Sequence, residues 1–200
     1  WTTKPSMNYS VETLWDVWDA LLAAPSDRDS YKYDVVNVGR QVLGDMFIGV
    51  RDDFTAAYKS GDLDGMKDNA ELMLEIIDDM DRLVSCHAEF SLKDWVDMAR
   101  SFGNTPEEKD YYETNARTLV SVWGDSYHLS DYASRAWAGM LSTFYKVRWE
   151  MFVNEVMESF KAGVPFDAKA FDARIWEFEN KWAKSSHKIE YPQAGDPVAV

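Results

Sequence analysis

Residues 34–58 read DVVNVGRQVLGDMFIGVRDDFTAAY, and their pattern decides the fold class of this chain. Apolar side chains recur in the stretch at steps of three and four, as at Val35, Val38 and Val42. Such spacing places one face of an α-helix against a core, whereas a half-buried strand alternates at every second residue. The stretch therefore predicts a long amphipathic helix.

Three glycines lie inside this predicted helix, at Gly39, Gly44 and Gly49. Each glycine lowers the stability of a helix by about 1 kcal/mol relative to alanine, so we expect a structural reason for their presence. A phosphate-binding loop would need a preceding strand, and none is expected here. We therefore expect these glycines to mark places where a neighbouring helix approaches closely.

The helical pattern continues on both sides of this stretch. Five residues of the types that cap helix N-termini each precede a segment of helical period: Ser10, Asp62, Ser91, Thr105 and Asp167. A further long helix is expected from near Ser130 to about Lys161, which would place Tyr132 on its first turn. Because no set of period-two strands is visible, we predict an all-α fold, an irregular array of about six to seven helices of uneven length.

Composition and charge exclude several functions. The chain has 200 residues, of which 46% are hydrophobic, so it is long enough for one domain with an adequate core. Its 21 Lys and Arg against 35 Asp and Glu leave a net charge of −14. That charge disfavours nucleic acid and an anionic membrane as partners, since both bind basic surfaces. No apolar run of about 18 residues is present, so no membrane span is expected.

The sequence offers no metal, cofactor or nucleophile signature. Its histidines, His87, His128 and His187, are far apart, and no His-Glu-x-x-His motif occurs. The single cysteine, Cys86, excludes an intramolecular disulfide, and we expect it to be a small core residue. The many acidic residues allow countless carboxylate pairs, and the sequence singles out none of them as catalytic. We therefore assign no metal site, no cofactor and no catalytic residue to this chain.

The segment from Trp123 to Trp149 is the most unusual part of the sequence, because aromatic residues cluster at an irregular turn between two expected helices. Flat rings with polar edges suit a sugar, whose C–H face is apolar and whose hydroxyl groups need partners. The same rings also fill cores. From the residues alone, both roles stay open for Trp123 and Tyr132, and the core role is favoured.

The same segment resembles the C-terminal helical region of glycoside hydrolase family 89, the alpha-N-acetylglucosaminidases. The likeness rests on Trp123-Gly124, Leu129-Ser130-Asp131-Tyr132-Ala133, Ala138-Gly139-Met140, Phe144-Tyr145 and Arg148-Trp149. Further similar runs extend it from about Tyr31 to Trp182. These include Tyr31 to Val36 with Arg40-Gln41, Asp110 to Glu113 with Asn115 to Arg117, and Gly163 to Phe166 with Phe171-Asp172.

The resemblance implies a function in which this chain does no bond cleavage. Family members remove terminal alpha-linked N-acetylglucosamine with retention of configuration. Their two catalytic glutamates lie on a (β/α)₈ barrel, against which the helical domain packs to close one side of the sugar pocket. The resemblance implies an intramolecular barrel domain as partner, a glycan ending in N-acetylglucosamine as substrate, and Trp123, Leu129 and Tyr132 as pocket residues. The chain alone is expected to fold and to be inactive.

The resemblance also implies a division of the chain. Residues 1–30 would form an N-terminal helix and a linker to the barrel, residues 31–187 the helical domain, and residues 188–200 an extended tail. The protein would be secreted or periplasmic if bacterial, and lysosomal if animal. Asp131 is expected to cap its helix and Arg148 to pair with an acid, both as structural residues.

Three other interpretations stay open at this point. The chain could be a non-catalytic helical module that binds a glycan or a protein. It could be a purely structural domain whose exposed apolar face needs a partner. It could also be an independent helical enzyme, which would need a metal or a nucleophile that the sequence does not reveal.

Overall fold

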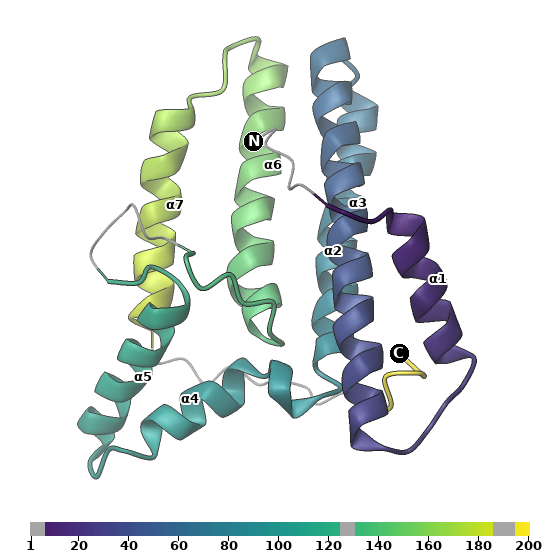
Figure 1. Ribbon diagram of the computed structural model, residues 1–200. Coiled ribbons are helices and arrows are strands. Elements are labelled where there is room, and N and C mark those ends of the chain that lie inside the picture. The colour runs from purple at the N-terminus through teal and green to yellow at the C-terminus, as the bar shows by residue number, and fades with distance from the viewer. Residues whose placement is uncertain (1–6, 125–130, 186–194) are drawn as a thin grey trace.

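The computed structural model describes residues 7–124, 131–185 and 195–200, and these residues form an all-α fold, as predicted (Figure 1). Its helices have uneven lengths, from 9 residues in α4 to 32 in α2. They are α1 (Val11–Leu22), α2 (Asp29–Ser60), α3 (Leu63–Val84), α4 (Leu92–Arg100), α5 (Pro106–Val120), α6 (Lys146–Ala162) and α7 (Ala168–Ala183). A 3₁₀ turn at Ala88–Phe90 precedes α4, and a π-helical turn at Leu141–Tyr145 leads into α6.

The predicted helix starts at Ser10, Asp62, Ser91, Thr105 and Asp167 are confirmed. The side chain of each accepts the backbone N–H three residues further on, which satisfies one of the free donors of the first turn. At Thr105 the Glu108 carboxylate also accepts the N–H of the capping residue, so a full capping box starts α5. Local chemistry alone is sufficient to place these five ends.

The helices pack as a long antiparallel pair with further helices around it. In Figure 1, α2 and α3 run side by side, α1 covers one flank, and α6 with α7 stands on the other, above α4 and α5. Three clusters of buried side chains fill the interior. The first lies between α2, α3 and the start of α6, the second between α2, α3 and the middle of α6, and the third between α4, α7 and the residues around Phe144.

The predicted close approach of helices is confirmed at Gly39. A Cβ atom built there would lie 2.6 Å from the Trp18 indole of α1 and 2.7 Å from a Leu83 methyl of α3. The Trp18 indole N–H donates to the Val35 carbonyl at 3.0 Å, which fixes the ring over α2. A Cβ at Gly44 would make only ordinary contact, and one at Gly49 would meet nothing within 4 Å, so the expectation is wrong at those two positions.

The helix predicted from near Ser130 begins later than expected, and Tyr132 does not lie on its first turn. Positive φ angles at Asp131 (60°) and Ser134 (45°) are incompatible with a right-handed helix. The first helical N–H groups are capped from another element instead. The Asp81 carboxylate of α3 accepts the N–H of Gly139 at 2.8 Å and that of Ser142 at 3.3 Å.

The other helix boundaries differ less from the predicted ones. The long helix expected from Asp34 starts at Asp29, so α2 is longer than the apolar pattern indicated. Among the residues that the structure describes, no helix combines the length and apolar character that crossing a membrane requires. The division of the chain at residues 30 and 187 stays a prediction, although α1 packs against α2 through Trp18.

Candidate functional site

The candidate site is the irregular connection between α5 and the π-helical turn. We call residues 121–124 and 131–134 of this connection the aromatic turn. Trp123 and Tyr132 lie together in it, with ring centroids 5.3 Å apart and planes inclined by 55°. Trp123 is 41% exposed and Tyr132 is 69% exposed, so these rings do not fill the core. Leu129 lies outside the described residues.

Backbone hydrogen bonds close the aromatic turn at its base. The Trp123 N–H donates to the Thr118 carbonyl at 2.7 Å, and the Asp131 N–H donates to the Ser121 carbonyl at 2.6 Å. Ser121 is buried, and its hydroxyl donates to the Arg117 carbonyl at 2.7 Å. These bonds tie both ends of the turn to the last turn of α5.

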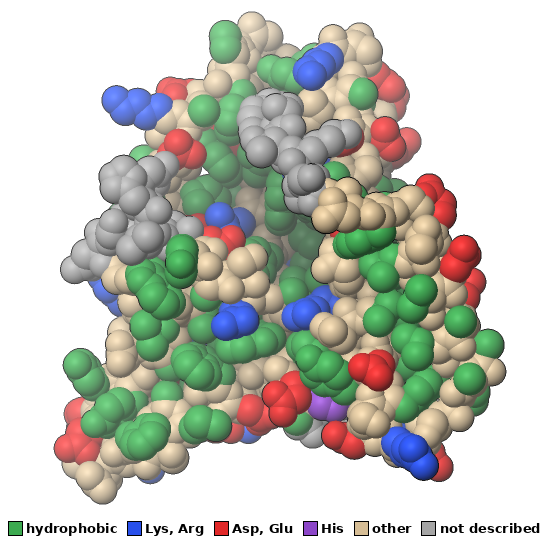
Figure 2. Space-filling model, viewed as in Figure 1, with side chains coloured by type: hydrophobic (Ala, Val, Ile, Leu, Met, Phe, Trp, Pro, Cys, Tyr) green, Lys and Arg blue, Asp and Glu red, His purple; other side chains and the backbone are tan. Residues whose placement is uncertain are grey.

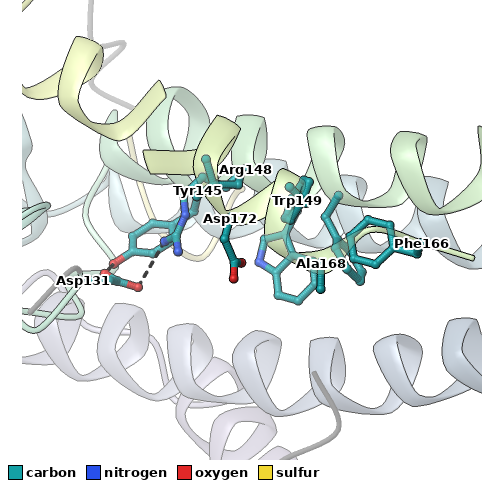
Figure 3. Close-up of a pocket in the computed structure, with 10 residues that line it drawn as sticks. Asp131, Tyr145, Arg148, Trp149, Phe166, Ala168 and Asp172 are labelled. Carbon is teal, nitrogen blue, oxygen red and sulfur yellow. Dashed lines mark hydrogen bonds and ion pairs between the residues drawn. The ribbon is translucent and has the colours of Figure 1, made fainter. Parts of the chain in front are cut away.

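A polar network behind the turn is centred on Asp131. Its carboxylate accepts the Tyr145 hydroxyl and, at 3.2 Å, an Arg148 guanidinium N–H. Figure 3 shows these three side chains pointing toward one another. The predicted pairing of Arg148 with an acid is confirmed. Asp131 does not cap a helix, because its backbone is left-handed and its carboxylate is engaged by Tyr145 and Arg148.

Arg148 connects this network to α7. Its Nε lies 2.9 Å from a carboxylate oxygen of Glu179, a residue only 2% exposed. Its guanidinium also stacks over the Phe144 ring at 5.1 Å and the Tyr145 ring at 5.8 Å. One arginine therefore joins the aromatic turn, the start of α6 and the C-terminal part of α7.

The environment of Tyr145 keeps its hydroxyl protonated. Burial raises the pKa of this phenol far above its usual value, and the negative charge of Asp131 raises it further. Across the physiological pH range the Tyr145 hydroxyl is therefore a hydrogen-bond donor to Asp131. Sequence reasoning missed Tyr145 and Glu179, since nothing in their local sequence indicates a partner at Asp131 or Arg148.

A groove of about 440 Å³ opens beside this network, between α6 and α7 (Figure 3). Asp131, Tyr145, Arg148 and Asp172 provide its polar groups. The remaining lining is apolar and mostly aromatic: Trp149, Phe152, Phe166, Phe171, Ala168 and Ile175. Asp131 thus belongs both to the aromatic turn and to the end of this groove.

A second apolar surface lies on α4 and α5. Met98, Phe102 and Tyr111 are each more than half exposed there, and a shallow groove of about 360 Å³ runs between the two helices. Figure 2 shows a group of hydrophobic side chains over α4 and α5, at the lower left. The apolar residues of α4 lie on one broad face, with Met98 at its edge, so the sequence pattern alone does not separate the exposed Met98 from the buried Leu92 and Val96.

The remaining reactive side chains do not assemble into a further site. Among the described residues, no three His, Cys, Asp or Glu side chains are grouped so that they could hold a metal ion. Burial raises the pKa of the Cys86 thiol, which keeps it in the unreactive protonated form. Cys86 is half-buried and packs against the first core cluster, as its predicted packing role requires.

Comparisons with known proteins identify relatives over the whole chain. The family model described as Alpha-N-acetylglucosaminidase (NAGLU) C-terminal domain matches residues 1–200. The human Alpha-N-acetylglucosaminidase is 27% identical over 197 residues, which are 96% of this chain and 26% of that protein. The chain therefore spans about a quarter of the length of this curated relative.

Solved structures share the fold. The Clostridium perfringens protein CpGH89, in complex with its substrate GlcNAc-alpha-1,4-galactose, superposes with a TM-score of 0.85 at 23% identity. The match covers 97% of this chain and 23% of that one. A family 89 glycoside hydrolase from the same organism, in complex with 2-acetamido-1,2-dideoxynojirmycin, gives the same score, identity and coverage.

Proposed function

Because the chain belongs to the family of alpha-N-acetylglucosaminidase C-terminal domains, we propose that it is the helical part of an exo-acting, retaining alpha-N-acetylglucosaminidase. The substrate would be a glycan that ends in alpha-linked N-acetylglucosamine. Since the chain spans only about a quarter of its human relative, the groups that cleave the bond would lie on a catalytic barrel in the rest of the protein. The role of this chain would be to pack on that barrel and to form part of the sugar pocket.

The observation that carries this proposal is the exposed pair of rings at the aromatic turn. Trp123 and Tyr132 contact each other at 5.3 Å and are inclined to one another rather than stacked face to face. Part of each ring is therefore open to a ligand. An apolar pyranose face packs well on such rings, and in this proposal the hydroxyl of Tyr132 and the indole N–H of Trp123 would bond to hydroxyl groups at its edge.

The surface on α4 and α5 supports packing against a larger partner. Exposed apolar side chains that gather on one face of a domain mark an interaction surface, and Met98, Phe102 and Leu119 form such a group around the groove between α4 and α5. The partner in this proposal is the barrel of the same polypeptide. Contact there would bury exposed rings of α5 and of the connection between α4 and α5. It would also hold α5, whose C-terminal end leads into the aromatic turn.

The test is kinetic and uses the full-length parent protein. In the Trp123→Ala and Tyr132→Ala variants, kcat/KM for an aryl alpha-N-acetylglucosaminide should fall by about tenfold or more, because each ring supplies contact area to the sugar. Trp15→Ala is a matched control, since Trp15 is 39% exposed and lies on α1, away from the aromatic turn. Unchanged kcat/KM in both aromatic-turn variants would refute the role in the sugar pocket.

One observation favours a second candidate, a non-catalytic glycan-binding module. The groove between α6 and α7 combines aromatic walls with a few polar groups, the usual composition of a ligand site. In that case the 200-residue chain alone would bind N-acetylglucosamine. Titration of the chain with the sugar, compared with its Trp123→Ala and Trp149→Ala variants, would identify this function and the site that carries it.

A further inference from the structure

We infer that Asp131, Tyr145 and Arg148 are positioning residues, which fix Tyr132 against Trp123 and thereby set the shape of the sugar-contacting surface. The inference rests on the proposed function in one respect, namely that these rings contact the sugar. Its structural part concerns this chain alone: the polar network behind the aromatic turn decides where the exposed rings lie.

The backbone of the aromatic turn needs such support. Among the described residues, the non-glycine positions with positive φ are Trp123 (58°), Asp131 (60°) and Ser134 (45°), and all three belong to this turn. L-residues avoid this region because the Cβ atom crowds the backbone. A strained conformation persists only where the surrounding structure determines it, so the contacts of these residues identify what holds the turn.

Asp131 provides three of those contacts. Its N–H is bonded to the Ser121 carbonyl at 2.6 Å, and its carboxylate accepts the hydroxyl of Tyr145 and a guanidinium N–H of Arg148. The first bond joins Asp131 to the end of α5, and the other two join it to the π-helical turn and the start of α6. The position next to Tyr132 is thus fixed from both sides.

Arg148 in turn is held by a buried acid. Its Nε lies 2.9 Å from the carboxylate of Glu179 on α7, and its guanidinium packs on the Phe144 and Tyr145 rings. A planar guanidinium with several fixed donors can face two carboxylates at once, which a lysine ammonium on a flexible chain does poorly. Because Arg148 is held by packed residues of α6 and α7, its bond to Asp131 fixes the aromatic turn relative to these two helices.

Packing against the core does little to fix the position of the Tyr132 side chain. It is largely exposed, and its described ring contact is with Trp123, which is itself partly exposed. Neither ring is placed by burial, in contrast to the rings of the core clusters. Their relative position depends on the backbone of the turn, and that backbone depends on Asp131.

The experiment is a double-mutant comparison in the full-length parent protein. Tyr145→Phe removes one hydroxyl from the network and keeps the partly buried ring in its packing, so folding is retained. We expect kcat/KM for an aryl alpha-N-acetylglucosaminide to fall by about fivefold to tenfold, the scale of one lost hydrogen bond, with most of the change in KM. In a Tyr132→Ala background the same substitution should have no further effect, because the ring through which it acts is gone.

Two further variants separate positioning from general stability. Tyr31→Phe is the matched control, since the Tyr31 hydroxyl donates to the Leu21 carbonyl at 2.8 Å, far along the chain from the turn, and its loss should leave kcat/KM unchanged. Arg148→Lys keeps the positive charge but loses the planar guanidinium with its fixed N–H donors. It should therefore raise KM as Tyr145→Phe does. Both network variants should retain the melting temperature of the control within a few degrees.

The outcomes distinguish this inference from the proposed function. If Tyr132→Ala lowers kcat/KM but Tyr145→Phe does not, only the positioning role is refuted. Equal losses from Tyr145→Phe with and without Tyr132 would also refute it, because a merely structural residue acts independently of the ring. A crystal structure of the Tyr145→Phe parent provides a readout without activity. Ring centroids that stay 5.3 Å apart would overturn the inference.

Discussion

Trp182 and Trp123 have the same side chain in opposite surroundings. Trp182 on α7 is 7% exposed, packs on Phe144 at 4.9 Å, lies under the Arg117 guanidinium and donates its indole N–H to the Thr143 hydroxyl at 3.0 Å. Trp123 is 41% exposed, and its described ring contact is with Tyr132. The molecule therefore places aromatic rings in two ways, by burial in the helical array and by backbone geometry at the aromatic turn.

The two modes have different consequences. A ring placed by burial contributes to stability and is unavailable to a ligand, whereas a ring placed by the backbone contributes little stability and stays accessible. Stability and sugar contact would then depend on separate residues of the same type. Substitutions at the two kinds of position can test this separation.

The largest expected effect is at Trp182. Trp182→Ala would remove a buried ring and leave the Arg117 guanidinium and the Thr143 hydroxyl without this partner. We expect a loss of about 3–5 kcal/mol in the free energy of unfolding, the range for large-to-small changes at buried aromatic positions. Chemical denaturation of the 200-residue chain measures it. A loss below about 1 kcal/mol would contradict the assignment of Trp182 to the core.

The next effect tests the close packing of α1, α2 and α3. Gly39→Ala would bring a methyl group within 2.6 Å of Trp18 and 2.7 Å of Leu83, so the helices must shift. Overpacking of this kind costs about 1–3 kcal/mol. Gly49→Ala is the control, because a Cβ there meets nothing within 4 Å, and it should be neutral or stabilising by up to about 1 kcal/mol. Thermal unfolding of the two variants compares them directly, and equal melting temperatures would contradict the close approach.

A smaller effect is expected at Asp81 on α3, whose carboxylate caps backbone N–H groups at the start of the π-helical turn that leads into α6. Asp81→Ala would leave the Gly139 and Ser142 N–H groups without this acceptor and should cost about 1–2 kcal/mol. Asp81→Asn retains an acceptor oxygen and removes a charge that burial disfavours, so it should cost less. Urea denaturation at neutral pH measures both variants.

The same residue gives a pH prediction. Burial raises the pKa of the Asp81 carboxyl in the folded state, and the bonds from Gly139 and Ser142 offset this only in part. The folded protein therefore binds this proton more tightly than the unfolded chain. As the pH falls from neutral into the acid range, the wild type should gain stability relative to Asp81→Asn. A stability difference that does not change with pH would contradict the raised pKa.

The contrast between Asp81 and the five N-terminal capping residues shows how far the sequence predicts this fold. Ser10 or Thr105 acts on the N–H groups of its own helix, so the local sequence contains all the information needed. Asp81 caps residues 58 positions further along the chain, and no local pattern contains that contact. The sequence pattern therefore predicts too early a start for the helix that contains α6, and it wrongly includes Tyr132 in that helix.

The site shows the same limit. An aromatic cluster at an irregular turn could be recognised from Trp123 and Tyr132, and the family resemblance singled them out. Their support could not be predicted, because Tyr145 and Glu179 reach Asp131 and Arg148 through tertiary packing. The exposure of the two rings could not be predicted from the sequence either, since composition and spacing are the same for a core ring and a surface ring.

The smallest stability effect is expected at Trp123, and it makes the comparison with Trp182 sharpest. Trp123→Ala removes a ring that already faces solvent and contacts only one described ring, so the free energy of unfolding should change by about 0.5 kcal/mol or less. In the parent protein the same substitution should lower kcat/KM, and Trp182→Ala should act mainly by lowering the amount of folded protein. Measuring the free energy of unfolding and kcat/KM for both variants shows whether each ring acts mainly on stability or mainly on sugar hydrolysis. If Trp123→Ala destabilised the chain as much as Trp182→Ala does, burial would place both rings, and the aromatic turn would be an extension of the core.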